Sequence, residues 1–160
     1  MEKTFTFDKL PENVEQLKAL SNLQDEYEVA ALVVLALCHY EKDVDKSIEM
    51  INYLKGPVDL NNLDKQFIRD RLANKKYLMR SYLAGTSVDN NYTPTIPYTI
   101  TVRDNPYSYS QEGYVTLYIT SSGADSDRSV QLRKKENQYF LWQNNLMVGI
   151  RLPKQEDPWK

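Results

Sequence analysis

The chain has few of the residues on which most enzyme chemistry depends. Its 160 residues include one cysteine, Cys38, one histidine, His39, and five scattered glycines. One cysteine cannot form an internal disulfide, and one cysteine with one histidine cannot supply the ligands of a usual zinc site. The glycines match no phosphate-binding loop, and no serine-hydrolase elbow is present. The sequence therefore predicts no catalytic residue, no metal site and no cofactor.

Long apolar runs are also missing. The longest run, Val29 to Cys38, is about half of what a helix needs to span a bilayer. The first residues mix charges and lack the apolar centre of a secretory signal. The single cysteine suits a reducing compartment, and a net charge of −2 gives no general attraction to nucleic acid or to anionic lipid. We therefore expect a cytoplasmic protein that does not bind membranes.

The first half of the sequence has helical periodicity. It predicts four helices, at about residues 10–20, 26–41, 43–55 and 59–75. The second is apolar on almost all sides, so we expect it at the centre of the core. Gly56-Pro57 ends the third, because glycine allows the left-handed exit and proline prevents continuation. In the fourth we expect the apolar residues to line the buried side, namely Leu60, Leu63, Phe67 and Leu72.

From Tyr98 onward apolar and polar residues alternate, which is typical of strands with one buried and one solvated face. The strands are predicted at about residues 98–103, 114–120, 130–133, 139–142 and 147–152, with tight turns at 136–137 and 144–145. The predicted fold class is α+β, with a bundle of about four helices packed on an antiparallel sheet of four to five strands. We expect one domain over residues 1–160, helical over about 10–82 and β over about 98–152.

Ordered blocks of sequence run along most of the chain, from about Leu10 to Trp159. They include YEVAALVVLALCHYEKD, INYLKGP, DKQFIRDRL, SYLAGTSVDNNYTP, YTITVRDNPYSY and the closing DPW. These blocks resemble an uncharacterised bacterial family that is classed as a domain of unknown function. The resemblance implies a bacterial, cytoplasmic protein. It implies no known activity, cofactor or catalytic residue.

Basic residues gather between Asn61 and Arg80, where six cations against two aspartates give a local charge of +4. Tyr77 and Tyr82 lie in or next to this stretch, and aromatic rings among cations can stack on bases. Cations near the end of a helix are also favoured by the helix dipole, so a solvated helix face explains the same pattern. Weak nucleic-acid binding through residues 65–80 is therefore kept as an alternative.

Tyrosine is abundant, with twelve in the chain and eight between Tyr77 and Tyr118. Tyrosine is enriched at interfaces, because it offers a large contact area and a polar tip at low entropy cost. It also has a high β propensity, so exposed tyrosines can simply stabilise a sheet. The candidate binding residues lie on the solvated strand face and in the polar-aromatic loop 103–110, and are Arg103, Tyr107, Tyr109, Tyr114 and Tyr118.

These features favour a non-enzymatic protein-interaction module, in which the Tyr/Thr-rich sheet face and the 103–110 loop meet an unidentified protein partner. A second copy of the chain is among the candidate partners. The first alternative is a small-ligand or enzymatic pocket between the helices and a curved sheet. The second is the nucleic-acid surface described above.

Overall fold

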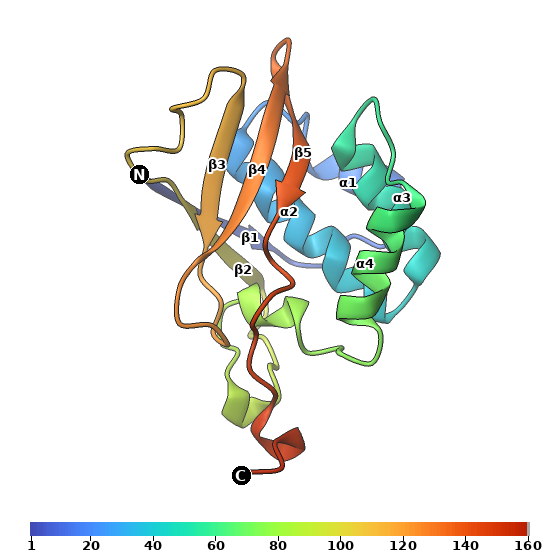
Figure 1. Ribbon diagram of the computed structural model, residues 1–160, viewed down its shortest axis with the longest axis vertical. Helices are drawn as coiled ribbons and strands as arrows, with labels where there is room; N and C mark the ends of the chain where they lie inside the picture. Colours follow the sequence, from blue (N-terminus) through green and yellow to red (C-terminus); the bar gives the residue numbers. More distant parts are fainter. Residues whose placement is uncertain (160) are drawn as a thin grey trace.

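The computed structural model describes residues 1–159 and confirms the α+β class. Over these residues the chain forms four α-helices and five strands (Figure 1), with the bounds β1 (Glu2–Phe7), α1 (Val14–Leu20), α2 (Glu26–Cys38), α3 (Val44–Lys55), α4 (Asn62–Leu72), β2 (Tyr98–Arg103), β3 (Tyr114–Ile119), β4 (Arg128–Lys135) and β5 (Gln138–Asn144). Short 3-10 helices lie at His39–Glu41, Met79–Tyr82, Val88–Asn90 and Lys154–Glu156.

The sheet has the order β1-β2-β3-β4-β5, and every neighbouring pair is antiparallel. β1 and β2 pair over their full length, but β2 meets β3 through a short junction at Val102–Ile119 and Arg103–Tyr118. The sheet therefore consists of a two-stranded ribbon that crosses a three-stranded part at an angle (Figure 1). This order leaves β1 and β5 at the two edges of the sheet.

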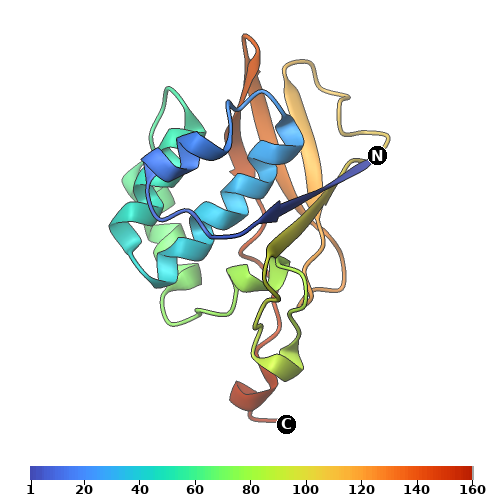
Figure 2. The same ribbon diagram turned by 180° about the vertical axis from the view of Figure 1, so that it is seen from behind.

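Helix α2 lies at the centre of the core, as its composition predicts. All residues from Val29 to Cys38 are buried, and the helix contacts all five strands. Figure 2 shows α2 lying across the inner face of the sheet, with α1 beside it. Asp25 caps its first turn by accepting a hydrogen bond from the Tyr27 N–H at 3.0 Å. A helix with no polar face can be stable only when other elements surround it.

The first strand, β1, is an addition that the periodicity did not predict. It alternates between exposed and half-buried residues, and its stability depends on β2, almost a hundred residues away. The Thr4 and Thr101 hydroxyls lie 2.9 Å apart across this pair. The following helix begins at Val14 rather than near Leu10, because the Asn13 side chain provides the cap.

The predicted strand at residues 147–152 is wrong, and residues 144–145 do not form a hairpin turn. After β5 the chain continues as irregular structure whose carbonyls are satisfied by side chains. Arg128 donates to the Val148 and Gly149 carbonyls at 2.8 and 3.1 Å, and the Tyr82 hydroxyl donates to Leu146. The sheet still has five strands, because β1 adds a strand at the opposite edge from β5.

The fourth helix is correct in place but only partly correct in orientation. Its start is fixed by a capping box between Asn61 and Asp64, and it ends at Leu72 rather than Lys75. Leu72 is buried as predicted, and Leu60 is half-buried against the core. Leu63 and Phe67 are exposed, contrary to the prediction, and Ile68 is buried instead. In the middle of the helix the inward side chain is therefore Ile68 rather than Phe67, about 100° further round the helix axis.

Candidate functional site

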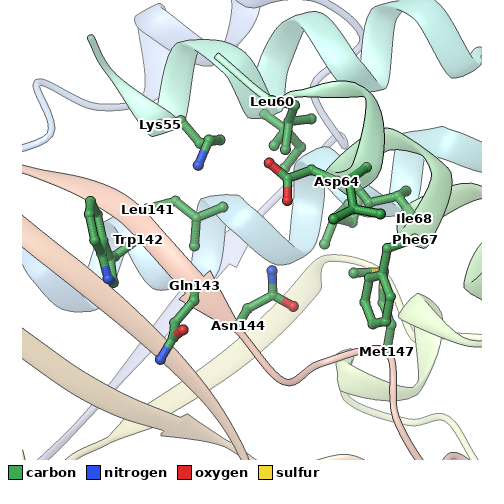
Figure 3. Close-up of a pocket in the computed structure, with 13 residues that line it drawn as sticks. Lys55, Leu60, Asp64, Phe67, Ile68, Leu141, Trp142, Gln143, Asn144 and Met147 are labelled. Carbon is green, nitrogen blue, oxygen red and sulfur yellow. The ribbon is translucent and has the colours of Figure 1, made fainter. Parts of the chain in front are cut away.

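A groove of about 330 Å³ opens between α3, α4 and the edge strand β5 (Figure 3). We call it the α4–β5 groove. Its lining residues are Leu37, Ile51, Lys55, Leu60, Leu63, Asp64, Phe67, Ile68, Leu141, Trp142, Gln143, Asn144 and Met147. A volume of this size is near the lower end of the range for small-ligand sites, about 300–1,000 Å³.

The walls of the groove are mostly apolar. Its floor consists of side chains that belong to the hydrophobic core, namely Leu37, Ile51, Ile68, Leu141 and Met147. Its rim consists of Leu63, Phe67 and Trp142, which are 78%, 42% and 46% exposed. Large apolar side chains that gather around an open hollow mark interaction sites more often than scattered exposed residues do.

Three polar side chains enter the groove. Figure 3 shows the polar ends of Lys55, Asp64 and Asn144 directed toward the space between the walls. The Asp64 carboxylate also accepts a hydrogen bond from the Asn61 N–H at 3.3 Å, as part of the helix cap. Among residues 1–159, Lys55 has no carboxylate within 4.0 Å. The groove therefore offers one unpaired ammonium in a largely apolar surface.

A register shift places Trp142 at the rim. Leu141 lies opposite Leu132 and Gln143 lies opposite Gln131, so Trp142 is an extra residue in β5. A bulge in an edge strand interrupts the regular row of backbone groups that another strand would need for pairing. The groove therefore favours recognition through side chains over the addition of a sixth strand.

Trp142 also joins the groove to the outer face of the sheet. Its ring packs edge-on against Tyr114, with the ring centroids 5.6 Å apart. The Arg133 guanidinium lies over both rings, 4.7 Å from the Trp142 centroid and 5.4 Å from that of Tyr114. The predicted binding residue Tyr114 is therefore next to the groove.

Arg103, a predicted binding residue, has several partners within the chain. Its guanidinium donates to the Thr120 hydroxyl at 2.5 Å and to the Asp127 carboxylate at 3.2 Å. A Glu2 carboxylate oxygen lies 3.4 Å from its other terminal nitrogen. These contacts connect β1, β2 and the segment before β4. Tyr118 is paired with Arg103 across the strands and is half-buried.

The 103–110 loop is tied to the body of the protein at several points. The Ser108 carbonyl accepts from the Thr116 N–H of β3 at 3.0 Å. The Tyr109 hydroxyl lies 3.4 Å from that of Tyr27, which donates to Asp104 at 2.8 Å. Burial, together with these two neighbours, raises the pKa of Tyr27 far above its usual value. Tyr107 is 76% exposed and does not line the α4–β5 groove.

The rim residues Leu63, Phe67 and Trp142 were missed by the sequence analysis. A signal for two of them was present, since Leu63 and Phe67 are four residues apart on a helix that is otherwise rich in charge. The orientation of α4 decides whether such a pair is buried or exposed, and the sequence alone leaves both open. The bulge that positions Trp142 has no local sequence signal.

A model of one protein family matches residues 9–154, which is most of the chain. The chain belongs to this family, a domain of unknown function, DUF6935. No curated protein and no solved structure matched the chain.

Between residues 1 and 159, no helix is both long and apolar enough to cross a membrane. The same part of the chain contains no group of three or more His, Cys, Asp or Glu side chains placed to hold a metal ion.

In this DUF6935 chain the two tyrosines near the basic stretch are buried. The Tyr77 ring stacks on Tyr92 at 5.6 Å between centroids, and Tyr82 donates to a main-chain carbonyl. Burial raises the pKa of both hydroxyls. Neither ring is therefore placed to stack on a base, although Lys65 remains exposed.

A second hollow of about 310 Å³ lies beside Lys76 and Arg80. Its charges are largely balanced, because Arg80 is 3.5 Å from the Glu41 carboxylate and Glu156 also lines the hollow. Its lining is polar and it lacks exposed large apolar side chains such as those of the α4–β5 groove. The groove is therefore the better candidate site.

Proposed function

We propose that this domain is a protein-interaction module that binds an apolar side chain of its partner in the α4–β5 groove. The observation that carries the proposal is the arrangement of Leu63, Phe67 and Trp142, exposed around a hollow whose floor is core. Interfaces are anchored by a few large side chains that enter such hollows and are desolvated there. Covering these three side chains with a partner would remove apolar surface from water, which is favourable.

The tyrosine-rich face predicted from the sequence extends this surface. Tyr114 contacts Trp142 and is therefore placed to meet a partner that covers the rim. Tyr107, Tyr109 and Tyr118 stay predictions for peripheral contacts. We place the module in the cytoplasm of a bacterium, which suits the family resemblance and a single buried cysteine, Cys38.

The proposal is tested with a displayed library of random peptides selected on the wild-type protein. The affinities of the selected peptides are then measured by fluorescence anisotropy. We expect Phe67→Ser and Trp142→Ser each to weaken binding at least about tenfold, as for anchor contacts at other interfaces. Ile96→Ser is the matched control, because Ile96 is also exposed but does not line the groove. Selected peptides that bind both rim variants as well as the wild type would refute the groove as the site.

A second candidate function is the binding of a small amphipathic molecule. It is favoured by the way in which Lys55, Asp64 and Asn144 direct their polar ends into an apolar hollow (Figure 3). Native mass spectrometry of the purified protein tests it. A bound small molecule that is present in the wild type and lost in Phe67→Ser would support this function. A wild-type mass equal to that of the bare chain would count against it.

A further inference from the structure

The rim of the α4–β5 groove carries cations that lack carboxylate partners. The Arg71 guanidinium lies 5.1 Å from the centroid of the Phe67 ring, and Arg133 lies 4.7 Å from that of Trp142. Lys55 lines the groove itself. In the part of the chain that the structure describes, none of the three cations has a carboxylate within 4.0 Å.

Among residues 1–159, three of the five other arginines have a carboxylate within 4.0 Å, whereas Arg69 and Arg128 do not. Arg80 is 3.5 Å from Glu41, Arg103 is 3.2 Å from Asp127, and Arg151 is 2.7 Å from Asp125. The chain as a whole is slightly acidic, with a net charge of −2. Carboxylates are therefore available in the sequence, and the cations at the groove are nevertheless left unpaired.

The one carboxylate that lines the groove is already in use. Asp64 accepts from the Asn61 N–H, and it lies in the first turn of α4, where the helix dipole stabilises a negative charge. The three cations and this single carboxylate have a summed charge of +2. A cation stacked on an exposed ring also keeps its outward N–H groups free to bind an anion.

We infer that the partner segment carries an apolar anchor residue with acidic residues beside it. This inference rests on the proposed function, and it adds the chemistry of the partner. The apolar anchor enters the floor between Ile68 and Leu141, and the flanking carboxylates lie against Lys55, Arg71 and Arg133. Guanidinium groups bind carboxylates with paired hydrogen bonds, and complementary charge raises both the association rate and the specificity.

A protein segment fits this surface better than a nucleic acid does. The floor of the groove is made of buried aliphatic side chains, which match an apolar anchor and offer nothing to a phosphate backbone. The tyrosines near the basic stretch, Tyr77 and Tyr82, are buried and cannot stack on bases. Arg71, the α4 cation at the rim of the groove, is therefore better explained as the electrostatic part of a peptide site.

The test uses a displayed peptide library of defined chemistry. Each member carries one anchor, Leu, Phe or Trp, between flanks that are all acidic, all neutral or all basic. The groove variant is Lys55→Gln/Arg71→Gln/Arg133→Gln. The control variant is Lys42→Gln/Lys75→Gln/Lys76→Gln, which removes the same charge from exposed residues that do not line the groove. Circular dichroism is used to check that both variants fold.

We expect the wild type to retain acidic-flanked peptides roughly tenfold better than neutral-flanked ones, from a few exposed ion pairs of modest strength each. The groove variant should lose this preference while still selecting apolar anchors, and the control should keep both. Added salt should reduce the preference in the wild type, because exposed charges are screened.

Other outcomes separate the inference from the proposed function. Equal retention of all three flank classes, with binding still lost in Phe67→Ser, would overturn the acidic partner and leave the protein-interaction module in place. Retention that is unchanged in Phe67→Ser and Trp142→Ser would overturn both. An oligothymidylate that displaced the acidic peptides more strongly than a polyglutamate of equal charge would assign the cations to nucleic acid instead.

Discussion

Helices α2 and α4 differ in how the fold covers their apolar residues. All of α2 from Val29 to Cys38 is enclosed by the five strands and the neighbouring helices. Helix α4 buries Ile68 and Leu72 but leaves Leu63 and Phe67 in solvent. Helix α2 therefore contributes to stability alone, whereas α4 has exposed apolar surface that can contact another molecule.

The largest difference is expected in the reactivity of a thiol on each helix. Cys38 is buried in α2, and burial raises its pKa to about 12. At pH 8 only about one such thiol in ten thousand is ionised, against roughly a quarter of ordinary thiols, and the thiolate is the reactive form. In a Leu63→Cys variant we expect the new thiol on α4 to react with iodoacetamide more than about a thousandfold faster than Cys38.

Mass spectrometry of the native variant measures this difference. One alkyl group per chain is the expected product, and peptide mapping places it at position 63. Both thiols should react once the protein is unfolded in urea. Rapid alkylation of Cys38 in the native protein would show that α2 is less enclosed than its burial indicates.

The next difference is the free energy of unfolding after truncation of one leucine on each helix. Leu32 is fully buried in α2, so Leu32→Ala leaves a cavity and should cost about 2–5 kcal/mol. Leu63 is 78% exposed, so Leu63→Ala should change the free energy by less than about 0.5 kcal/mol. Urea unfolding followed by fluorescence measures both. A large loss of unfolding free energy in Leu63→Ala would mean that Leu63 is packed against the core.

The sequence predicts those parts of this contrast that neighbouring residues determine by themselves. The position and burial of α2 follow from a run of apolar residues with no polar face, and the end of α3 follows from Gly56-Pro57. The alternation over 98–103 and 114–120 likewise gives two strands nearly residue for residue.

Features that depend on distant partners were not predicted. β1 is stable through its pairing with β2, and nothing within residues 2–7 identifies that partner. The groove has the same origin. Leu63 and Phe67 are apolar in either orientation of α4, and they face outward because Ile68 and Leu72 pack into the core. The candidate residues Arg103 and Tyr118 were selected for composition, and composition does not reveal that Glu2 and Asp127 already pair with Arg103.

A smaller effect is expected from alkaline pH, through a tyrosine packed beside α2. Tyr82 lies in the 3-10 helix that contacts α2, and its hydroxyl donates to the Leu146 carbonyl. Burial raises its pKa well above the unfolded value of about 10. The folded state therefore favours the neutral form, so its contribution to stability is complete below about pH 10 and falls as the pH rises above that value.

For one such tyrosine the loss is about 1.4 kcal/mol for each pH unit above the unfolded pKa. Urea unfolding at a series of pH values, with tyrosinate absorbance as a second signal, measures it. Tyr82→Phe should be less stable than the wild type at neutral pH, because the Leu146 carbonyl loses its donor, but should show a shallower alkaline loss. An identical pH dependence in Tyr82→Phe and the wild type would contradict the role of this hydroxyl.

The smallest effect is expected at the cap of α4, and it bears directly on the groove. The Asn61 side chain accepts from the Asp64 N–H at 2.8 Å, so Asn61→Ala should cost about 1 kcal/mol. Asn61→Ser should keep the cap, and Asn62→Ala one position later should have little effect. Because α4 buries few of its side chains, the loss of stability should appear as local opening of α4, with faster amide exchange there and unchanged exchange in α2.

A frayed first turn would also move Leu63 and Asp64, which line the groove. Peptide affinity should therefore fall in Asn61→Ala and be restored in Asn61→Ser, whereas a groove that acts independently of α4 would bind both variants equally.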